Sequence, residues 1–192
     1  LRDDKPTIVN YCDFSCIWDW KNFKEFVNDE NCIGCIPAYK GFHPHSLGKT
    51  NYAYIRDESG IVEDIQEKEP FTSNKMNEFA SSGTYYFSSG SKMKESFNYA
   101  ISEGLNTEGE FYVSLAYKYF IKKHEKVSVY PLQHFMQWGT PQDLDEFNYW
   151  FETFKMTKSK KNKKVAKTGS TIIPMAGMGK RFSDEGYLSP KP

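Results

Sequence analysis

The sequence predicts an α/β domain in which helices flank a largely parallel sheet. Short apolar segments with strand character alternate along the chain with amphipathic segments of helical spacing, and this alternation is typical of parallel sheets. Aromatic residues make up 17% of the 192 residues, which is enough large apolar surface to build a sizeable core. Near the C-terminal end a lysine-rich stretch breaks the alternation, and it predicts a domain boundary.

The first half of the chain is expected to form strands and one helix. Asp19 can cap the helix, because its side chain can accept hydrogen bonds from the backbone of the first turn and apolar residues follow at helical spacing. Residues 57–60 are turn formers between two strands and predict a hairpin. Residues 13–18 are expected to form the loop after the first strand. The predicted strands are residues 6–12, 32–39, 51–56 and 61–68.

The second half is expected to continue the alternation. One strand is predicted at residues 79–87 and a shorter one at residues 126–131. The last helix begins with Pro141, which fits the first turn because no backbone N–H is needed there. The predicted helices are residues 92–103, 110–124 and 141–155.

A flexible linker is expected at residues 157–169. This segment is rich in lysine and has almost no apolar side chains, so it cannot bury a face. Because no aromatic residues are interleaved with the lysines, a solvated tether is favoured over a nucleic-acid-binding tail. The linker divides the chain into a first unit, residues 1–156, and a short second unit, residues 170–192.

The charge balance and the apolar pattern argue against two classes of partner. The 25 basic and 25 acidic residues cancel, so no strong field attracts nucleic acid or an anionic membrane. No run of about 18 apolar residues is present. The first residues, 1–5, also lack the apolar core of a signal peptide. We therefore expect a cytoplasmic protein with no nucleic-acid and no membrane partner.

The four cysteines have two interpretations. Cys12, Cys16, Cys32 and Cys35 are spaced almost as in a zinc ribbon. However, Cys12 ends an apolar segment and the last two lie in a segment with strand character, whereas ribbon cysteines lie on glycine-rich turns. Small buried thiols in a reducing compartment are therefore favoured over zinc.

The C-terminal unit has the composition of a phosphate-binding loop. A short apolar strand, residues 170–174, runs into a glycine-rich segment. Gly177 and Gly179 have no side chain and can adopt positive φ, so their backbone N–H groups can approach a triphosphate. Lys180, Arg181 and Lys191 add cationic charge close by.

Several motifs together resemble the sugar-phosphate nucleotidyltransferase family, of the type that serves capsule and cell-surface sugars. They are Ala176-Gly177-Met178-Gly179-Lys180-Arg181-Phe182, Ser189-Pro190-Lys191-Pro192 and Gly139-Thr140-Pro141-Gln142-Asp143-Leu144. The resemblance implies the Rossmann-like nucleotide-diphospho-sugar transferase fold, incomplete or permuted. The glycine loop opens a domain in this family, so the chain is expected to span the back two-thirds of one domain and the start of another.

The resemblance also implies roles for individual residues. Asp13 would bind Mg²⁺ and act in catalysis with Arg181 and Lys191, and Gln137 stands where many relatives have a second metal-binding aspartate. Glu69 separates Lys68 from Pro70, which departs from the Glu-Lys-Pro element of the family. The nucleotide would be bound by Ala176, Gly177, Gly179 and Lys180. The sugar phosphate would be bound by Glu67, Lys68, Gly83 and Glu110.

The reaction implied joins a nucleoside triphosphate to a sugar-1-phosphate and gives a nucleotide sugar and pyrophosphate. One alternative is a glycosyltransferase that uses a nucleotide sugar, and another is a non-catalytic fragment that assembles with a second chain. We expect the isolated chain to have little activity, because a linker separates the glycine loop from Asp13. The strand at residues 171–175 is expected to pair with an exposed sheet edge, in its own chain or by exchange in a homodimer.

Overall fold

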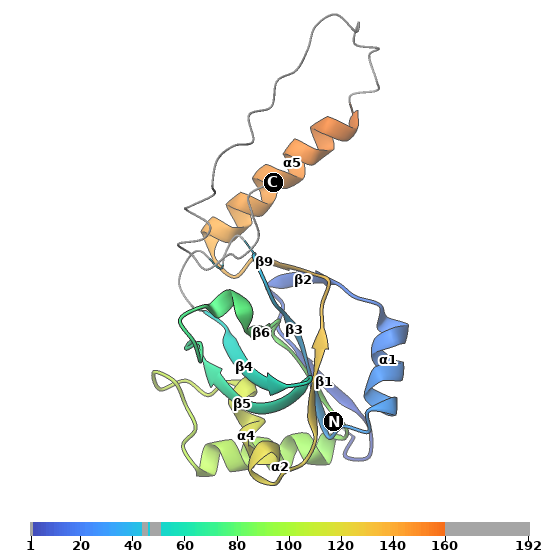
Figure 1. The fold of residues 1–192 in the computed structure, drawn as a ribbon, viewed down its shortest axis with the longest axis vertical. Coiled ribbons are helices and arrows are strands. Elements are labelled where there is room, and N and C mark those ends of the chain that lie inside the picture. Colours follow the sequence, from blue (N-terminus) through green and yellow to red (C-terminus); the bar gives the residue numbers. More distant parts are fainter. Residues whose placement is uncertain (1, 44–45, 47–50, 160–192) are drawn as a thin grey trace, which may run out of the picture.

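The computed structural model describes residues 2–43, 46 and 51–159 (Figure 1). In this part of the chain a seven-stranded sheet has helices on both faces, and a two-stranded ribbon lies at one end. The α/β class is therefore confirmed. The proposed unit 170–192 lies outside the described residues.

The main sheet curls into a small barrel. Strand β3 pairs with β7, β6 and β8, so β3, β6, β4, β5 and β8 form a closed circuit of pairings, while β1 and β7 extend from it. All six residues of β3 are buried, as expected for a strand at such a junction. In spatial order the strands are β1 (Thr7–Asn10), β7 (Thr84–Phe87), β3 (Gly34–Tyr39), β6 (Phe79–Ser81), β4 (Ala53–Glu58), β5 (Ile61–Glu67) and β8 (Val127–Pro131).

The prediction of a largely parallel sheet was wrong. Within the described residues β3 and β8 pair in parallel, and the other pairings of the sheet are antiparallel. The reason is the type of connection, because antiparallel neighbours need only a tight turn whereas parallel neighbours need a long crossover. Ser59 and Gly60, with φ of 52° and 83°, join β4 to β5 as a two-residue hairpin turn.

Two further strand predictions need correction. The segment 13–18 is not a loop, because β2 (Phe14–Ile17) pairs with β9 (His134–Gln137) in the antiparallel ribbon. The predicted strand at 79–87 is two strands, β6 and β7, since Gly83 turns the chain between them with a φ of 86°.

The helices follow the predicted capping signals, with one break. Asp19 caps α1 (Trp20–Asp29) by accepting hydrogen bonds from the backbone of the first turn at 2.9 and 3.0 Å, as predicted. The helix predicted at 110–124 is instead α3 (Val113–Ala116) and α4 (Lys118–Lys122), separated at Tyr117. The other described helices are α2 (Gly90–Ser102), the short 3₁₀ helix η2 (Lys75–Asn77) and α5 (Pro141–Ser159).

Helix α5 extends away from the barrel (Figure 1). It continues to Ser159, so the first residues of the predicted linker are helical. The rest of that linker lies outside the part of the chain that the structure describes. No described helix is long and apolar enough to cross a membrane.

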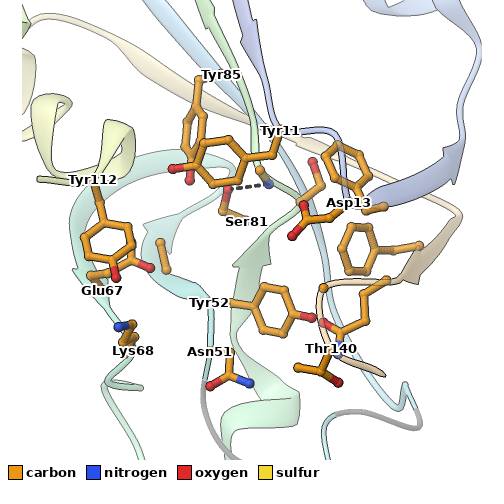
Figure 2. A pocket seen from close by; sticks show the side chains of 17 residues that line it. Tyr11, Asp13, Asn51, Tyr52, Glu67, Lys68, Ser81, Tyr85, Tyr112 and Thr140 are labelled. Carbon is orange, nitrogen blue, oxygen red and sulfur yellow. Dashed lines mark hydrogen bonds between the residues drawn. The ribbon is translucent and has the colours of Figure 1, made fainter. Parts of the chain in front are cut away.

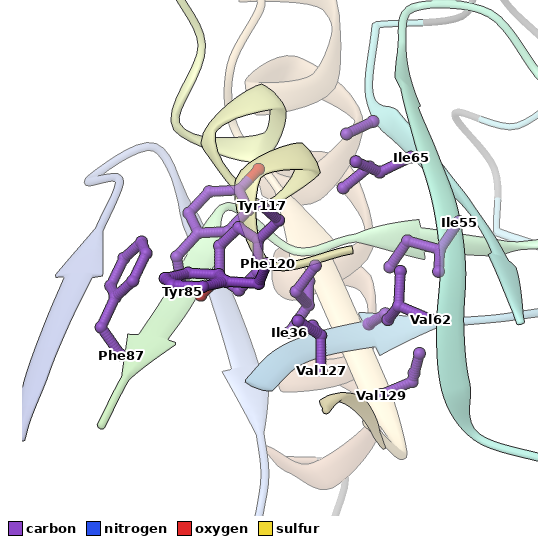
Figure 3. Close-up of a cluster of buried hydrophobic side chains, with 12 residues drawn as sticks. Ile36, Ile55, Val62, Ile65, Tyr85, Phe87, Tyr117, Phe120, Val127 and Val129 are labelled. Atoms are coloured by element: carbon purple, nitrogen blue, oxygen red, sulfur yellow. The ribbon is translucent and has the colours of Figure 1, made fainter. Parts of the chain in front are cut away.

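The main core lies between the barrel and the helices α2 to α4. Tyr117 is fully buried there, and its ring packs against Phe87 in a tilted arrangement and against Phe120 edge-on (Figure 3). Its hydroxyl donates a hydrogen bond to the Tyr86 carbonyl at 2.6 Å. Gly34 makes room for this ring, because a Cβ at that position would lie 2.6 Å from Tyr117 Cε1.

A second core lies under α1 and contains thiols. Cys32 and Cys35 are buried there, and the partly buried Cys16 packs against the same cluster. Cys12 is exposed, so the expectation of buried thiols was wrong for this residue.

We predict that Tyr117→Phe lowers the free energy of unfolding by about 1 to 2 kcal/mol, because it removes a buried hydrogen-bond donor. Urea unfolding measures this change. Tyr99→Phe is the matched control, since the Tyr99 hydroxyl accepts a bond from Lys122 at the surface, and it should change stability by less than about 0.5 kcal/mol. Equal stability of Tyr117→Phe and the parent chain would contradict the prediction.

Candidate functional site

A cavity of about 380 Å³ opens where the barrel meets the β2–β9 ribbon (Figure 2). Glu67, Lys68 and Tyr112 form one side of it, and Asp13 and Thr140 lie on the other. The lining residues come from segments that are far apart in the sequence. They are Tyr11, Asp13, Phe14, Asn51, Tyr52, Ala53, Glu67, Lys68, Ser81, Ser82, Gly83, Tyr85, Tyr112, Phe135, Gln137, Gly139 and Thr140.

The ribbon places Asp13 beside Gln137. Phe14 is the partner of Gln137 in the β2–β9 register, and the Trp138 N–H donates to the Asp13 carbonyl at 2.7 Å. The Asp13 side chain is exposed to the cavity. Gly139 allows this placement, since a Cβ there would lie 3.0 Å from Asp13 Oδ2. A carboxylate and an amide from neighbouring strand ends therefore both line the cavity.

Glu67 ends strand β5 as a half-buried carboxyl group. Burial raises its pKa above the usual 4.5, while a hydrogen bond from Ser114 and the charge of Lys68 partly oppose the rise. Ser114 is itself buried in the short helix α3. The Ser114 hydroxyl thus orients the Glu67 carboxyl group by donating a hydrogen bond to it.

Lys68 occupies a conformation that is rare for lysine. Its φ is 59°, in the left-handed region that costs a non-glycine residue free energy, and its N–H donates to the Tyr52 carbonyl at 2.9 Å. The ammonium lies 3.0 Å from Glu108 Oε2 and 5.1 Å from the centroid of the Tyr112 ring. Hydrogen bonds with Tyr112 and Glu108 raise the pKa of Lys68, so it remains charged near neutral pH.

Gly83 contributes backbone without a side chain to the cavity lining. Its positive φ favours glycine, and a Cβ there would lie 2.9 Å from Tyr11 Cδ2 and 3.3 Å from Phe14 Cε1. The Gly83 N–H donates a hydrogen bond to Ser81 Oγ at 3.1 Å (Figure 2). The two rings therefore pack on the glycine and line the cavity at the same time.

Not all of the predicted site residues line the cavity. Asp13, Glu67, Lys68, Gly83 and Gln137 do. Glu110 is exposed and is linked to the cavity through Tyr112, whose hydroxyl donates to its carboxylate. The predicted residues Ala176, Gly177, Gly179, Lys180, Arg181 and Lys191 lie outside the described part of the chain.

The sequence reasoning missed the aromatic lining. Phe135 stacks on Tyr39 at a centroid distance of 4.3 Å, and Tyr52 meets Phe135 edge-on at 6.0 Å. Burial raises the pKa of Tyr52, with smaller contributions from Asp143 and Asp13. Two of these aromatic residues could have been found from the sequence, because Tyr11 and Tyr112 each lie two positions from a predicted site residue.

The fit of a divalent cation depends on Asp13 and Gln137. Among the described residues, no group of three or more histidine, cysteine, aspartate or glutamate side chains could hold a metal ion. Mg²⁺ is commonly held by one or two carboxylates together with substrate phosphates and water. Asp13 and Gln137 fit that mode, in which the phosphates provide most of the remaining oxygen ligands.

Comparisons with known proteins give matches in structure but not in sequence. No protein-family model and no curated protein matches the chain. Among solved structures, a nucleoside-diphosphate-sugar pyrophosphorylase from Vibrio cholerae RC9 is similar with a TM-score of 0.57 and 16% identity, over 74% of this chain and 55% of that one.

Two structures of UDP-glucose pyrophosphorylase, one complexed with UDP-glucose and one without ligand, are similar at TM-scores of 0.59 and 0.56. Their identities are 15% and 17%, over 78% and 79% of this chain. The chain spans only 57% and 56% of those proteins. The described domain thus shares its fold with about half of several nucleotide-sugar pyrophosphorylases.

Proposed function

We propose that the chain provides the sugar-phosphate part of a sugar-1-phosphate nucleotidyltransferase site. The supporting observation is the cavity, in which Glu67 and Lys68 lie opposite Asp13 (Figure 2) and Gln137 is part of the lining. The fold shared with nucleotide-sugar pyrophosphorylases supports the same reaction class. The product is a nucleoside-diphosphate sugar for cell-surface polysaccharide, and the chain is the back of one transferase domain joined to the start of another.

The proposed reaction is a direct displacement at the α-phosphorus, which transfers a nucleotidyl group. An oxygen of the sugar-1-phosphate attacks the α-phosphorus of the nucleoside triphosphate and forms a new P–O bond. The bond from the α-phosphorus to the oxygen that bridges to the β-phosphorus breaks, and pyrophosphate leaves with that oxygen. No protein nucleophile is required, so positioning and charge neutralisation provide most of the catalysis.

The sugar-phosphate end of the cavity is assigned to Lys68 and Glu67. Lys68 binds the phosphate, since its ammonium is charged and is already positioned between Glu108 and the Tyr112 ring. Glu67 accepts hydrogen bonds from sugar hydroxyl groups, and Ser114 orients it. Gly83 offers close approach to the backbone, and Glu110 acts through Tyr112. The rings of the lining exclude water around the sugar.

The triphosphate end is assigned to Asp13 and Gln137, which would hold Mg²⁺. When bound, the ion would neutralise negative charge on the triphosphate. We propose that the nucleotide is bound by residues beyond the described part of the chain. These residues are Ala176, Gly177, Gly179, Lys180, Arg181 and Lys191.

The test of this function is binding of a sugar-1-phosphate to the chain, which does not require complete turnover. We expect glucose-1-phosphate or another member of a panel of sugar-1-phosphates to bind in isothermal titration calorimetry. Lys68→Gln should weaken that binding at least about tenfold, because it removes the cationic donor of a charge-assisted hydrogen bond to the phosphate.

Lys94→Gln is the matched control for this test. Lys94 also pairs with a carboxylate, that of Asp3 at 2.6 Å, but it does not line the cavity. Binding by Lys94→Gln should equal that of the parent chain. The assignment fails if no sugar-1-phosphate binds, or if the two variants bind equally well.

Glu67 generates a prediction about stability and pH. Its pKa is raised in the folded state, so the native protein binds more protons than the unfolded one between pH 4.5 and the raised value, and stability falls as pH rises through this window. Glu67→Gln removes the cost of ionisation and keeps an oxygen that accepts from Ser114. We expect the variant to be more stable than the parent at pH 7.5 and equally stable below pH 4.

Urea unfolding at both pH values checks this expectation. Glu63→Gln is the control, because Glu63 lies on the same strand, is exposed and pairs with Arg56 at 3.6 Å. It should give no gain at either pH. A lower free energy of unfolding for Glu67→Gln at pH 7.5 would contradict the prediction, because it would show that the ionised carboxylate stabilises the fold.

A further inference from the structure

Strand β1 is the outermost strand of the main sheet. Its partner is β7, in an antiparallel register from Thr7 opposite Phe87 to Asn10 opposite Thr84. Within the described residues no strand pairs with its other edge. Natural sheets usually protect such an edge with charged residues or proline inside the strand. The sequence of β1, Thr-Ile-Val-Asn, has neither.

An apolar groove runs beside this edge. It has a volume of about 430 Å³ and lies between β1 and helix α1. Ile8 on the strand is 37% exposed and Trp20 on the helix is 47% exposed, which is high for side chains of their size and apolarity. The groove is lined by Pro6, Ile8, Trp20, Phe23, Lys24, Val27, Asn28 and Tyr86.

An unpaired strand edge next to an apolar groove is the geometry of strand addition. In this mode the incoming backbone bonds to the edge, and alternate side chains enter the groove. The shape of the site therefore calls for an extended segment with apolar residues. It does not suit a helix, which would leave the backbone groups of β1 without partners.

We propose that the edge of β1 binds residues 171–175 of a second copy of this chain, so that two copies exchange these segments. The sequence Thr171-Ile172-Ile173-Pro174-Met175 is short, apolar and β-branched, as strand addition requires. Pro174 has no N–H and must face away from β1. Because N–H groups alternate in direction along a strand, Ile173 and Met175 are the residues that pair with the edge.

The reach of the chain favours exchange over pairing within one copy. Helix α5 has 19 residues and is therefore about 28 Å long, and it leads away from the barrel (Figure 1). Its start lies near Asp13, whose carbonyl accepts a hydrogen bond from the Trp138 N–H at 2.7 Å. A return to β1 must therefore cover roughly the length of α5 in reverse.

Eleven residues, 160–170, separate α5 from the proposed strand. A flexible chain of that length has a typical end-to-end distance of roughly 18 Å. Even fully extended, it spans no more than about 40 Å. Pairing within one copy would thus stretch the linker well beyond its typical end-to-end distance, whereas exchange with a neighbouring copy does not require the linker to retrace the length of α5.

The test is the mass in solution of the full chain, measured by light scattering over a range of concentrations. We expect a dimer. Deletion of residues 170–192 and Ile8→Asp should each give a monomer, and circular dichroism verifies that both remain folded. Ile101→Asp is the matched control, because Ile101 is 62% exposed on helix α2 and does not line the groove, and this variant should remain a dimer.

A peptide of residues 169–177 gives a second measurement that does not depend on the dimer. Added to the deletion variant, it should shift the tryptophan emission to shorter wavelength as Trp20 becomes covered, and the shift should be much smaller in Trp20→Phe. A monomeric full chain overturns the exchange. A dimer that survives the deletion, or a peptide that causes no Trp20 shift, overturns the assignment of residues 171–175 as the occupant.

Discussion

The pairing of β3 with three other strands is the constraint on which the rest of the structure depends. Because β3 pairs with β7, β6 and β8, neither of its edges is exposed to water, and all of its residues are buried. The sheet must then close, and β5 and the turn between β6 and β7 are brought to the same end of the barrel. Gly34 accepts the Tyr117 ring at the other end of β3, so the closure and the main core depend on one strand.

The candidate site concentrates features that stability alone would not favour. Glu67 is a carboxyl group whose pKa is raised by burial, and Lys68 next to it has a left-handed backbone. Such features persist only where the surrounding structure fixes them, and they cluster at functional sites. The barrel supplies that rigidity, since Glu67 ends strand β5, which pairs with β4 along its whole length, and Lys68 follows directly.

The sequence predicted local structure better than pairing. The cap at Asp19 and the hairpin at residues 57–60 depend on a few adjacent residues, and both were found. The parallel contact of β3 with β8 joins segments some ninety positions apart, and no local pattern contains it. The five predicted residues that line the cavity were found through the short motifs that contain them, whereas its aromatic lining depends on which side chains the closed sheet turns inward.

Helix α5 has a consequence for the cooperativity of the fold. It packs on β9 near its start but leaves Tyr149, Trp150 and Phe154 about half exposed or more, so little of its length is stabilised by tertiary contacts. In proteins most of the stability of a helix comes from the packing of one of its faces against the rest of the fold. The outer turns of α5 therefore form a separate low-stability unit, which opens and exchanges its amide hydrogens while the barrel stays folded.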